Sequence, residues 1–232
     1  MNKTDIHPIQ SKVLCELLFV QQASFSELKK MDIGTDLFSF HLRQLTDLGL
    51  VSKTEKGKYC LTTKGKEYAN RFDTEATEVE RQPKIGVLII GVKNENGQTK
   101  YLMQQRLKQP YFGFWGFVTG KIRWGEKFEE TALRELGEET GLKGKCELVG
   151  IEHKTDLAED GTVLEDKVFV TFKATELKGE LQENFEGGKN QWMSKTEIEK
   201  LTEPFDDVEA IIEDMESGIF WFRERSFKVK RY

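Results

Sequence analysis

The chain has 232 residues, of which 38% are hydrophobic and 32% are charged, and its formal net charge is −5 at pH 7. These values describe a soluble globular protein of one large or two modest domains. No stretch approaches the roughly 20 apolar residues of a membrane span, so we expect no membrane partner. The three cysteines are scattered and lack metal-site spacing, which favours reduced thiols and a cytoplasmic location.

The first 75 residues show the pattern of a small helical module. Apolar residues recur at helical spacing over residues 9–21, and Ser24 or Ser26 can cap a short second helix. A third helix is predicted from a turn at 34–36 to Leu48, where Gly49 stops it. Two short strands are expected over 50–53 and 59–62 with a turn between them, and a closing helix over 63–72.

Three helices, a hairpin and a helix follow one another in the order of a winged helix-turn-helix. The run F-H-L-R-Q-L-T-D-L-G-L-V at 40–51, with G-K-Y-C-L-T-T-K-G-K at 57–66, resembles the recognition helix and wing of small bacterial regulators. Residues 41–71 hold seven basic and three acidic side chains, which suits a polyanion or an ordinary solvated surface. In a complex with duplex DNA, the expected contacts are Ser39, Arg43 and Gln44 in the major groove and Lys56 and Lys58 on the backbone. The alternative is a winged helix that forms a homodimer or contacts another protein.

A second domain is predicted over residues 83–232, after a first domain at 1–75 and a polar linker at 76–82. A buried strand is expected over 85–92, a turn at 94–97 and a returning strand over 99–106. Further strands are predicted over 147–155, 167–175 and 191–194, with an acidic, mobile loop at 156–166. A final amphipathic helix is expected over 206–217, followed by an aromatic and basic tail at 219–232.

The stretch at 120–142 carries the strongest chemical signal. Its residues at fixed offsets are Gly120, Glu126, Arg134, Glu135, Glu138, Glu139 and Gly141. On a helix over 127–140, the last three glutamates fall within an arc of about 100° and repel one another. A cation is therefore expected among them, and oxygen ligands without His or Cys favour Mg²⁺ or Mn²⁺. A solvated acidic helix would carry the same charges, but the surrounding glycines and Arg134 argue for a metal site.

These residues match G-x5-E-x7-R-E-U-x-E-E-x-G-U at every position, where U is a bulky aliphatic, so the stretch resembles the Nudix box. The resemblance implies an α/β/α sandwich with a mixed sheet, which makes the whole chain α+β or α/β. It also implies that Glu135, Glu138 and Glu139 are catalytic and hold the metal with Gly120. Arg134 would orient them, and Glu126 would contribute at the loop. Gly141 follows the last helical turn, as a C-cap glycine does.

One more carboxylate resembles a residue of MutT-type enzymes. Glu186, in the run E-G-G that precedes W-M-S, corresponds to an additional catalytic or metal-binding glutamate in that group, with Glu183 as the fallback. Nudix enzymes differ over which carboxylate is the base, so both Glu135 and Glu186 remain candidates.

Two functions fit these features. The first is a metal-dependent hydrolase that cleaves a nucleoside diphosphate linked to another moiety. The second is a DNA-binding transcription regulator whose Nudix domain senses a nucleotide-like ligand, because some Nudix-related regulators combine these two modules. The intact box favours catalysis, and the sequence does not name the substrate.

Overall fold

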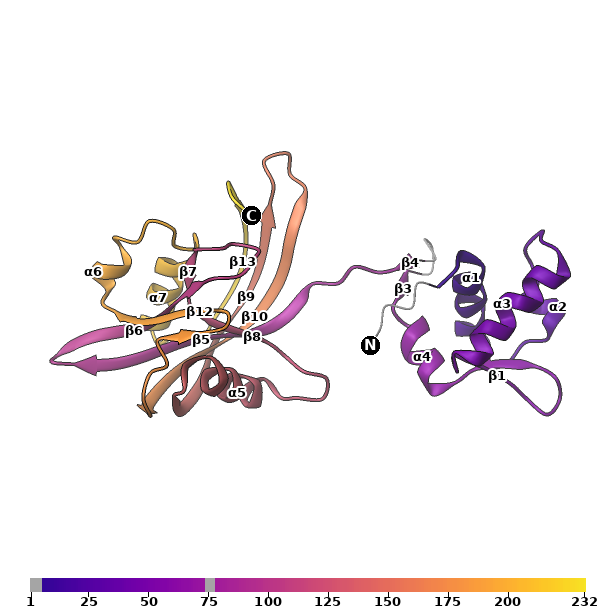
Figure 1. The fold of residues 1–232 in the computed structure, drawn as a ribbon, viewed down its shortest axis with the longest axis horizontal. Coiled ribbons are helices and arrows are strands. Elements are labelled where there is room, and N and C mark those ends of the chain that lie inside the picture. Colours follow the sequence, from indigo (N-terminus) through magenta and orange to yellow (C-terminus); the bar gives the residue numbers. More distant parts are fainter. Residues whose placement is uncertain (1–5, 74–77) are drawn as a thin grey trace. The chain divides into compact units, whose positions relative to one another are not determined.

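The computed structural model describes residues 6–73 and 78–232, and the chain divides into two compact units, Met1–Arg81 and Gln82–Tyr232 (Figure 1). The division lies within the predicted linker at 76–82. Two residues of that linker, Glu78–Val79 (β4), pair antiparallel with Phe72–Asp73 (β3) and so belong to the first unit. Residues 76 and 77 lie outside the described part of the chain. No helix in that part is long and apolar enough to cross a bilayer.

The first unit has the element order expected of a winged helix. Its elements are α1 (Pro8–Leu18), α2 (Phe25–Leu28), α3 (Thr35–Asp47), β1 (Val51–Lys53), β2 (Tyr59–Leu61) and α4 (Thr63–Ala69), before β3 and β4. The closing helix ends at Ala69 rather than at residue 72, because Phe72 enters the β3 strand. Ser24 caps α2, since its hydroxyl accepts from the Glu27 backbone N–H and Glu27 accepts from the Ser24 N–H.

The core of the first unit is built from the apolar faces of α1 and α3. Val13, Leu14, Phe38 and Leu45 are all fully buried there. His41 is also buried, and its ring stacks on the ring of His7 with centroids 4.2 Å apart. Burial lowers the pKa of His41, so this side chain belongs to the core and not to a phosphate-binding surface.

The second unit is a mixed sheet with helices on both faces. Its strands are β5 (Lys84–Glu95), β6 (Gln98–Arg106), β7 (Trp115–Gly116), β8 (Val118–Lys121), β9 (Lys143–Leu157), β10 (Val163–Lys178), β11 (Asn184–Phe185), β12 (Gly188–Met193) and β13 (Trp221–Lys228). They follow the order β11-β12-β6-β5-β10-β9-β13, and β8 pairs with β5 at the end that β6 leaves free. The pairs β10–β5 and β13–β9 are parallel, which makes the sheet mixed.

Alternation along β5 decides which helix covers which face. Val87 and Ile89 face α5 (Phe128–Thr140), where Leu136 is fully buried. Leu88 and Ile90 point the other way, toward α6 (Lys195–Ile198) and α7 (Val208–Glu216). Figure 1 shows α5 on one side of the sheet and α6 and α7 on the other. The predicted α/β/α sandwich with a mixed sheet is confirmed.

Two predictions about charged segments were wrong. The expected acidic loop at 156–166 is mostly strand, because β9 extends to Leu157 and β10 begins at Val163. Two of its acids, Asp156 and Glu165, are buried register partners of each other. The expected tail at 219–232 contains β13, which adds to the edge of the sheet beside β9. Charged residues in buried strands lower the apparent hydrophobicity on which the loop predictions depended.

The contact between β13 and β9 gives a stability prediction. Glu152 on β9 is 1% exposed and lies 3.1 Å from Nε of Arg225 on β13. Burial, opposed by Arg225, raises the pKa of Glu152 to about 7. In the unfolded chain Glu152 ionises near pH 4.5. Its burial in the folded protein therefore lowers the free energy of unfolding progressively as pH rises from 4.5 to 7, and above pH 7 no further stability is lost. We expect Glu152→Gln to unfold at a higher temperature than wild type at pH 8 and at a similar temperature at pH 4.5. Thermal melts that differ equally at both pH values would contradict this assignment.

Candidate active site

Helix α5 carries the residues singled out in the sequence. It begins after Lys127, whose backbone N–H donates to Glu130 at 3.1 Å, and it ends at Gly141, which adopts a left-handed φ of +74°. A Cβ atom on Gly141 would lie 2.9 Å from the Glu180 carbonyl oxygen, so the position requires glycine. Ala132 anchors the inner face of the helix, and the adjoining edge presents the glutamates.

Arg134 is the centre of an ion-pair network along this edge. Its Nε and Nη2 donate to the two carboxylate oxygens of Glu126 at 2.6 and 2.8 Å. Its Nη1 donates to Glu135 at 2.7 Å and to Glu138 at 3.0 Å. Arg134 holds the pKa of Glu126 at about 2, so Glu126 stays ionised at all physiological pH values.

Gly120 lies in β8 directly beside Glu135. A Cβ atom on Gly120 would lie 2.0 Å from Cγ of Glu135, so only glycine lets the glutamate occupy its position. Register pairing of Gly120 with Val87 of β5 holds the backbone there. The Glu135 carboxylate is consequently fixed between α5 and β8.

Glu139 lies one helical turn after Glu135 and accepts a hydrogen bond from Nε2 of Gln104 on β6 at 3.0 Å. Burial raises the pKa of Glu139, partly opposed by the Gln104 hydrogen bond, and the nearby Glu135 raises it further. Gln104 also donates to Asn190 of β12. A carboxylate that is held in place and partly desolvated would gain from a bound cation.

Glu138 and Glu186 are placed differently from these two residues. The Glu138 side chain is 51% exposed and is also bonded by Nη2 of Arg123, at 3.3 Å to each carboxylate oxygen. Glu186 is exposed in the turn between β11 and β12. Within residues 6–73 and 78–232, no three His, Cys, Asp or Glu side chains converge on one point as metal ligands.

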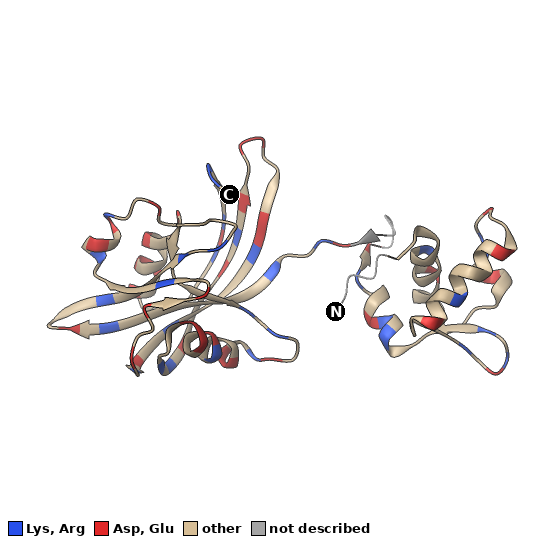
Figure 2. Ribbon diagram, in the orientation of Figure 1, with Lys and Arg blue, Asp and Glu red and all other residues tan. Residues whose placement is uncertain are grey.

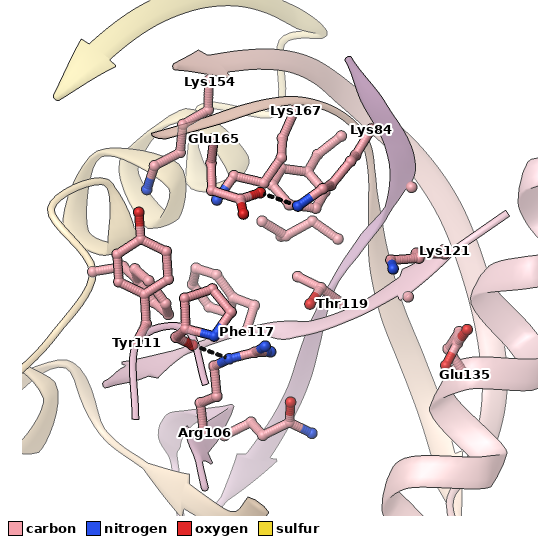
Figure 3. Close-up of a pocket in the computed structure, with 18 of the residues that line it drawn as sticks. Lys84, Arg106, Tyr111, Phe117, Thr119, Lys121, Glu135, Lys154, Glu165 and Lys167 are labelled. Carbon is pink, nitrogen blue, oxygen red and sulfur yellow. Dashed lines mark hydrogen bonds and ion pairs between the residues drawn. The ribbon is translucent and has the colours of Figure 1, made fainter. Parts of the chain in front are cut away.

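One cavity of about 560 Å³ includes part of this set of residues (Figure 3). Gly120, Glu135 and Glu139 line it at one end, whereas Glu138 and Glu186 do not line it. Arg106, Lys108 and Lys121 line it as well, and none of the three forms an ion pair with any described residue. The volume is in the range of small-molecule sites. Arg106 donates to the backbone carbonyls of Gln109 and Pro110, but no described carboxylate pairs with any of the three cations, which favours an anionic ligand.

The residues present fit a hard divalent cation. The Glu135 and Glu139 carboxylates and the backbone carbonyl of Gly120 are oxygen donors, and they lie at the same end of the cavity. Mg²⁺ is commonly held by one or two carboxylates together with waters and substrate phosphates, so a convergent set of three acids is not required. Because Gly120 lacks a Cβ atom, the Glu135 side chain can lie directly against the backbone of Gly120.

Comparison with known proteins identifies the family. The NUDIX domain profile matches residues 82–213. The chain belongs to the NUDIX domain family. A MutT protein from Bacillus halodurans is 27% identical, with a TM-score of 0.53, over 64% of this chain and 93% of that one. The NUDIX domain of Shewanella oneidensis NrtR, solved with ADP ribose, is 22% identical, with a TM-score of 0.52, over 67% of this chain and 98% of that one, and shows the same fold.

A curated relative matches over a shorter segment. An octanoyltransferase from Myxococcus xanthus is 34% identical over 77 residues, which are 32% of this chain and 22% of that protein. The chain therefore spans about a fifth of the length of that curated relative. The Nudix profile matches more than half of the chain, and the intact box at 120–142 lies within the matched residues.

Several residues of the Nudix cavity could not be found from the sequence pattern. Gln104, Arg106 and Lys108 lie on or just after β6, and their strand showed only ordinary alternation. Lys154 and Lys167 were assigned to strands without a role. The available signals were the lysine–carboxylate spacings K-T-D at 154–156 and E-D-K at 165–167, which place both charges on one face of a strand.

The residues proposed for DNA binding lie on the first unit as follows. Arg43 is exposed on α3, and Lys56 is exposed between β1 and β2. Ser39 and Lys58 are half-buried, and Gln44 accepts a hydrogen bond from Gln10 at 2.9 Å. The exposed side of α3 also carries Leu37, 48% exposed, and Phe40, 51% exposed. Acidic and basic side chains both occur on α3 and on the loop between β1 and β2 (Figure 2).

Proposed function

We propose that the chain is a divalent-metal-dependent Nudix pyrophosphohydrolase that cleaves a nucleoside diphosphate linked to another moiety. The observation that carries this proposal is the cavity in which Glu135 and Glu139 face three cations that lack ion-pair partners. Carboxylates at one end suit a metal, and cations without carboxylate partners beside them suit a diphosphate. The free cysteines agree with a cytoplasmic location.

The side chains have distinct proposed roles. Arg106, Lys108 and Lys121 would bind the phosphate oxygens and neutralise charge that develops during cleavage. Glu135 is the stronger candidate for the general base, because it lines the cavity whereas Glu186 is exposed in a turn outside it. Arg134 would keep Glu135 in a fixed orientation, and Gln104 would do so for Glu139.

Glu135, Glu139 and the Gly120 carbonyl would hold Mg²⁺ or Mn²⁺, and Glu138 would join them by turning away from Arg123. A bound ion of this kind lowers the pKa of a water molecule and neutralises phosphate charge. Glu126 and Gly141 would act indirectly, through Arg134 and the helix end respectively.

The test is a panel of nucleoside diphosphate derivatives with Mg²⁺ or Mn²⁺, in which the release of phosphate-containing products is measured. We expect turnover of at least one member to require the metal and to yield a nucleoside monophosphate. A panel covering several nucleosides and linked groups, with no metal-dependent turnover, would count against the proposal.

A transcription regulator is the second candidate, and the winged-helix element order of the first unit favours it. The proposed DNA contacts are Ser39, Arg43 and Gln44 on α3 and Lys56 and Lys58 at the wing. Leu37 and Phe40 on the exposed side of α3 equally suit a homodimer interface. The two possibilities differ in their dependence on salt, because phosphate contacts release counterions.

For the regulator, we predict that the full chain binds duplex DNA from its own upstream region more weakly as salt increases. Arg43→Ala should weaken this binding by about 5- to 100-fold if Arg43 reads a base edge. Fluorescence anisotropy at several salt concentrations measures both effects. Arg71→Ala, at an exposed position after α4 and outside the set of proposed contacts, is the matched control. Absence of any duplex binding at low salt would eliminate this candidate.

A further inference from the structure

A short segment of the Nudix unit, residues 107–114, determines where one cation of the cavity lies. The segment connects β6 to β7, which pair with each other. Arg106, at the end of β6, donates from Nη2 to the carbonyl of Gln109 at 3.1 Å and from Nε to the carbonyl of Pro110 (Figure 3). The direction of the Arg106 guanidinium therefore depends on the conformation of this segment.

The segment has few backbone hydrogen bonds of its own. Gly113 donates to the carbonyl of Arg106 at 2.7 Å, and Phe114 donates to the carbonyl of Tyr111 at 3.2 Å. In the described part of the chain, the backbone N–H groups at positions 108, 109, 111 and 112 donate to no acceptor. Tyr111 has a left-handed φ of +65°, and such strain persists only where surrounding contacts hold it. The segment therefore requires support from other parts of the unit.

Residues 229–232, which follow β13, provide this support, and we call them the strap. The strap begins on the sheet, because the Val229 backbone N–H donates to the carbonyl of Leu157 at 2.9 Å. From there Nη2 of Arg231 donates to the carbonyl of Phe112 at 2.8 Å. The Arg231 guanidinium also lies 5.9 Å from the centre of the Phe114 ring. One side chain of the strap thus contacts the segment at two of its residues.

Tyr232 contacts the segment from a second direction. Its ring meets the ring of Tyr111 edge to face, with centroids 5.2 Å apart. Its hydroxyl donates at 2.8 Å to Glu165, which is 5% exposed. Tyr111 is 3% exposed and donates its own hydroxyl to Asp156 at 2.7 Å. The strap and the sheet together therefore enclose the Tyr111 side chain and hold the segment against the cavity.

The stability of the fold does not account for Arg231. Its side chain is 56% exposed, and its ion pair with Glu203, at 3.4 Å, is exposed as well. Exposed ion pairs contribute little to stability. A hydrogen bond from a charged donor to a backbone carbonyl is stronger than a neutral one and fixes the position of that carbonyl. Arg231 is therefore better suited to fixing the segment than to stabilising the unit.

We propose that Arg231 and Tyr232 are positioning residues of the Nudix cavity. The strap holds residues 107–114 so that the guanidinium of Arg106 keeps one direction toward the cavity. This inference rests on the proposed function, in which Arg106 binds phosphate oxygens. Neither Arg231 nor Tyr232 lines the cavity, so the effect of the strap reaches a ligand through the segment.

The first test is Arg231→Met, measured with a substrate that the nucleoside diphosphate panel identifies. We expect KM to rise by about 5- to 20-fold and kcat to fall by a smaller factor, because a phosphate contact is weakened. Arg231→Lys retains a cationic donor for the Phe112 carbonyl and should restore part of the affinity. A merely structural role would reduce the amount of folded enzyme, which lowers the apparent kcat and leaves KM unchanged.

The matched control is Arg223→Met. Arg223 lies on β13, forms an exposed ion pair with Asp214 and does not line the cavity. Its substitution should change KM by less than about twofold. A rise in KM as large as that of Arg231→Met would contradict the specific role of the strap.

A double-mutant cycle tests whether the strap acts through Arg106. In an Arg106→Gln background, the guanidinium that the strap positions is absent, so Arg231→Met should raise KM further by less than about twofold. The same factor in both backgrounds would show that Arg231 acts by another route and would overturn the inference. If Arg106→Gln has no measurable turnover, calorimetric binding of inorganic pyrophosphate to the four proteins replaces KM in the cycle.

Hydrogen exchange followed by mass spectrometry tests the strap without turnover. The amides of Gly113 and Phe114 should exchange at least about fivefold faster in Arg231→Met than in wild type or Arg223→Met. Unchanged exchange, or faster exchange with an unchanged KM, would overturn the positioning role. If wild type turns over no member of the panel, the hydrolase proposal fails, and affinity for inorganic pyrophosphate replaces KM. Equal affinities of wild type and Arg231→Met, or no binding by wild type, would then overturn the inference too.

Discussion

Glu139→Gln is expected to lower kcat by at least about 10²-fold while the protein remains folded. Glu139 is held by Gln104 at the end of the cavity where Gly120 and Glu135 also lie. An amide keeps the shape of the side chain but removes the charge that the proposed metal requires. Because burial raises the pKa of Glu139, its ionised form reduces stability near neutral pH, and the variant should melt at the same temperature as wild type or higher.

Steady-state kinetics on a substrate identified by the panel, together with thermal melts, measure both effects. Glu129→Gln is the matched control, because Glu129 is exposed in the first turn of the same helix and does not line the cavity. Glu138→Gln should also reduce kcat by about 10²-fold if Glu138 turns from Arg123 to the metal. Unchanged turnover in Glu139→Gln would remove the metal assignment.

Arg134→Met is expected to weaken Mn²⁺ binding and to reduce kcat, each by about 10- to 100-fold. Arg134 contacts three carboxylates, and its two bonds to Glu126 form a bidentate pair that keeps the guanidinium in place. Without it, Glu126, Glu135 and Glu138 would repel one another, and the orientation of Glu135 toward the cavity would be lost. Lysine has a single ammonium group and cannot form the two parallel hydrogen bonds that the guanidinium makes with Glu126. Arg134→Lys should therefore be more active than Arg134→Met but less active than wild type.

Titration of free Mn²⁺ by electron paramagnetic resonance reports binding independently of turnover. Arg123→Met is the control, because the Arg123 side chain is 63% exposed and its guanidinium bonds only Glu138 among the described residues. Its effect on Mn²⁺ affinity should be less than threefold. Tighter Mn²⁺ binding in Arg134→Met would mean that Arg134 competes with the ion for the carboxylates, which is opposite to the role proposed for it.

The sequence alone predicted α5 and its chemistry because those features depend on local spacing. Helical periodicity puts Glu135 and Glu139 one turn apart on the side next to Leu136, whatever the rest of the chain does. Gly141 stops the helix for an equally local reason, since its left-handed φ strongly favours glycine. The continuous apolar run at 85–92 likewise predicted a buried strand near the start of the second unit.

The tertiary structure decided which distant residues meet at the site. Gln104 of β6 reaches Glu139, 35 residues away, because α5 packs on the sheet. Lys84 reaches Glu165, 81 residues away, because β5 pairs with β10. Register across a sheet is set by the packing of both faces, and a shift of one residue would turn Lys84, Lys154 and Lys167 to the opposite face. That dependence on long-range packing is why Asp156 and Glu165 were predicted in a loop, whereas they are buried partners of lysines in the folded sheet.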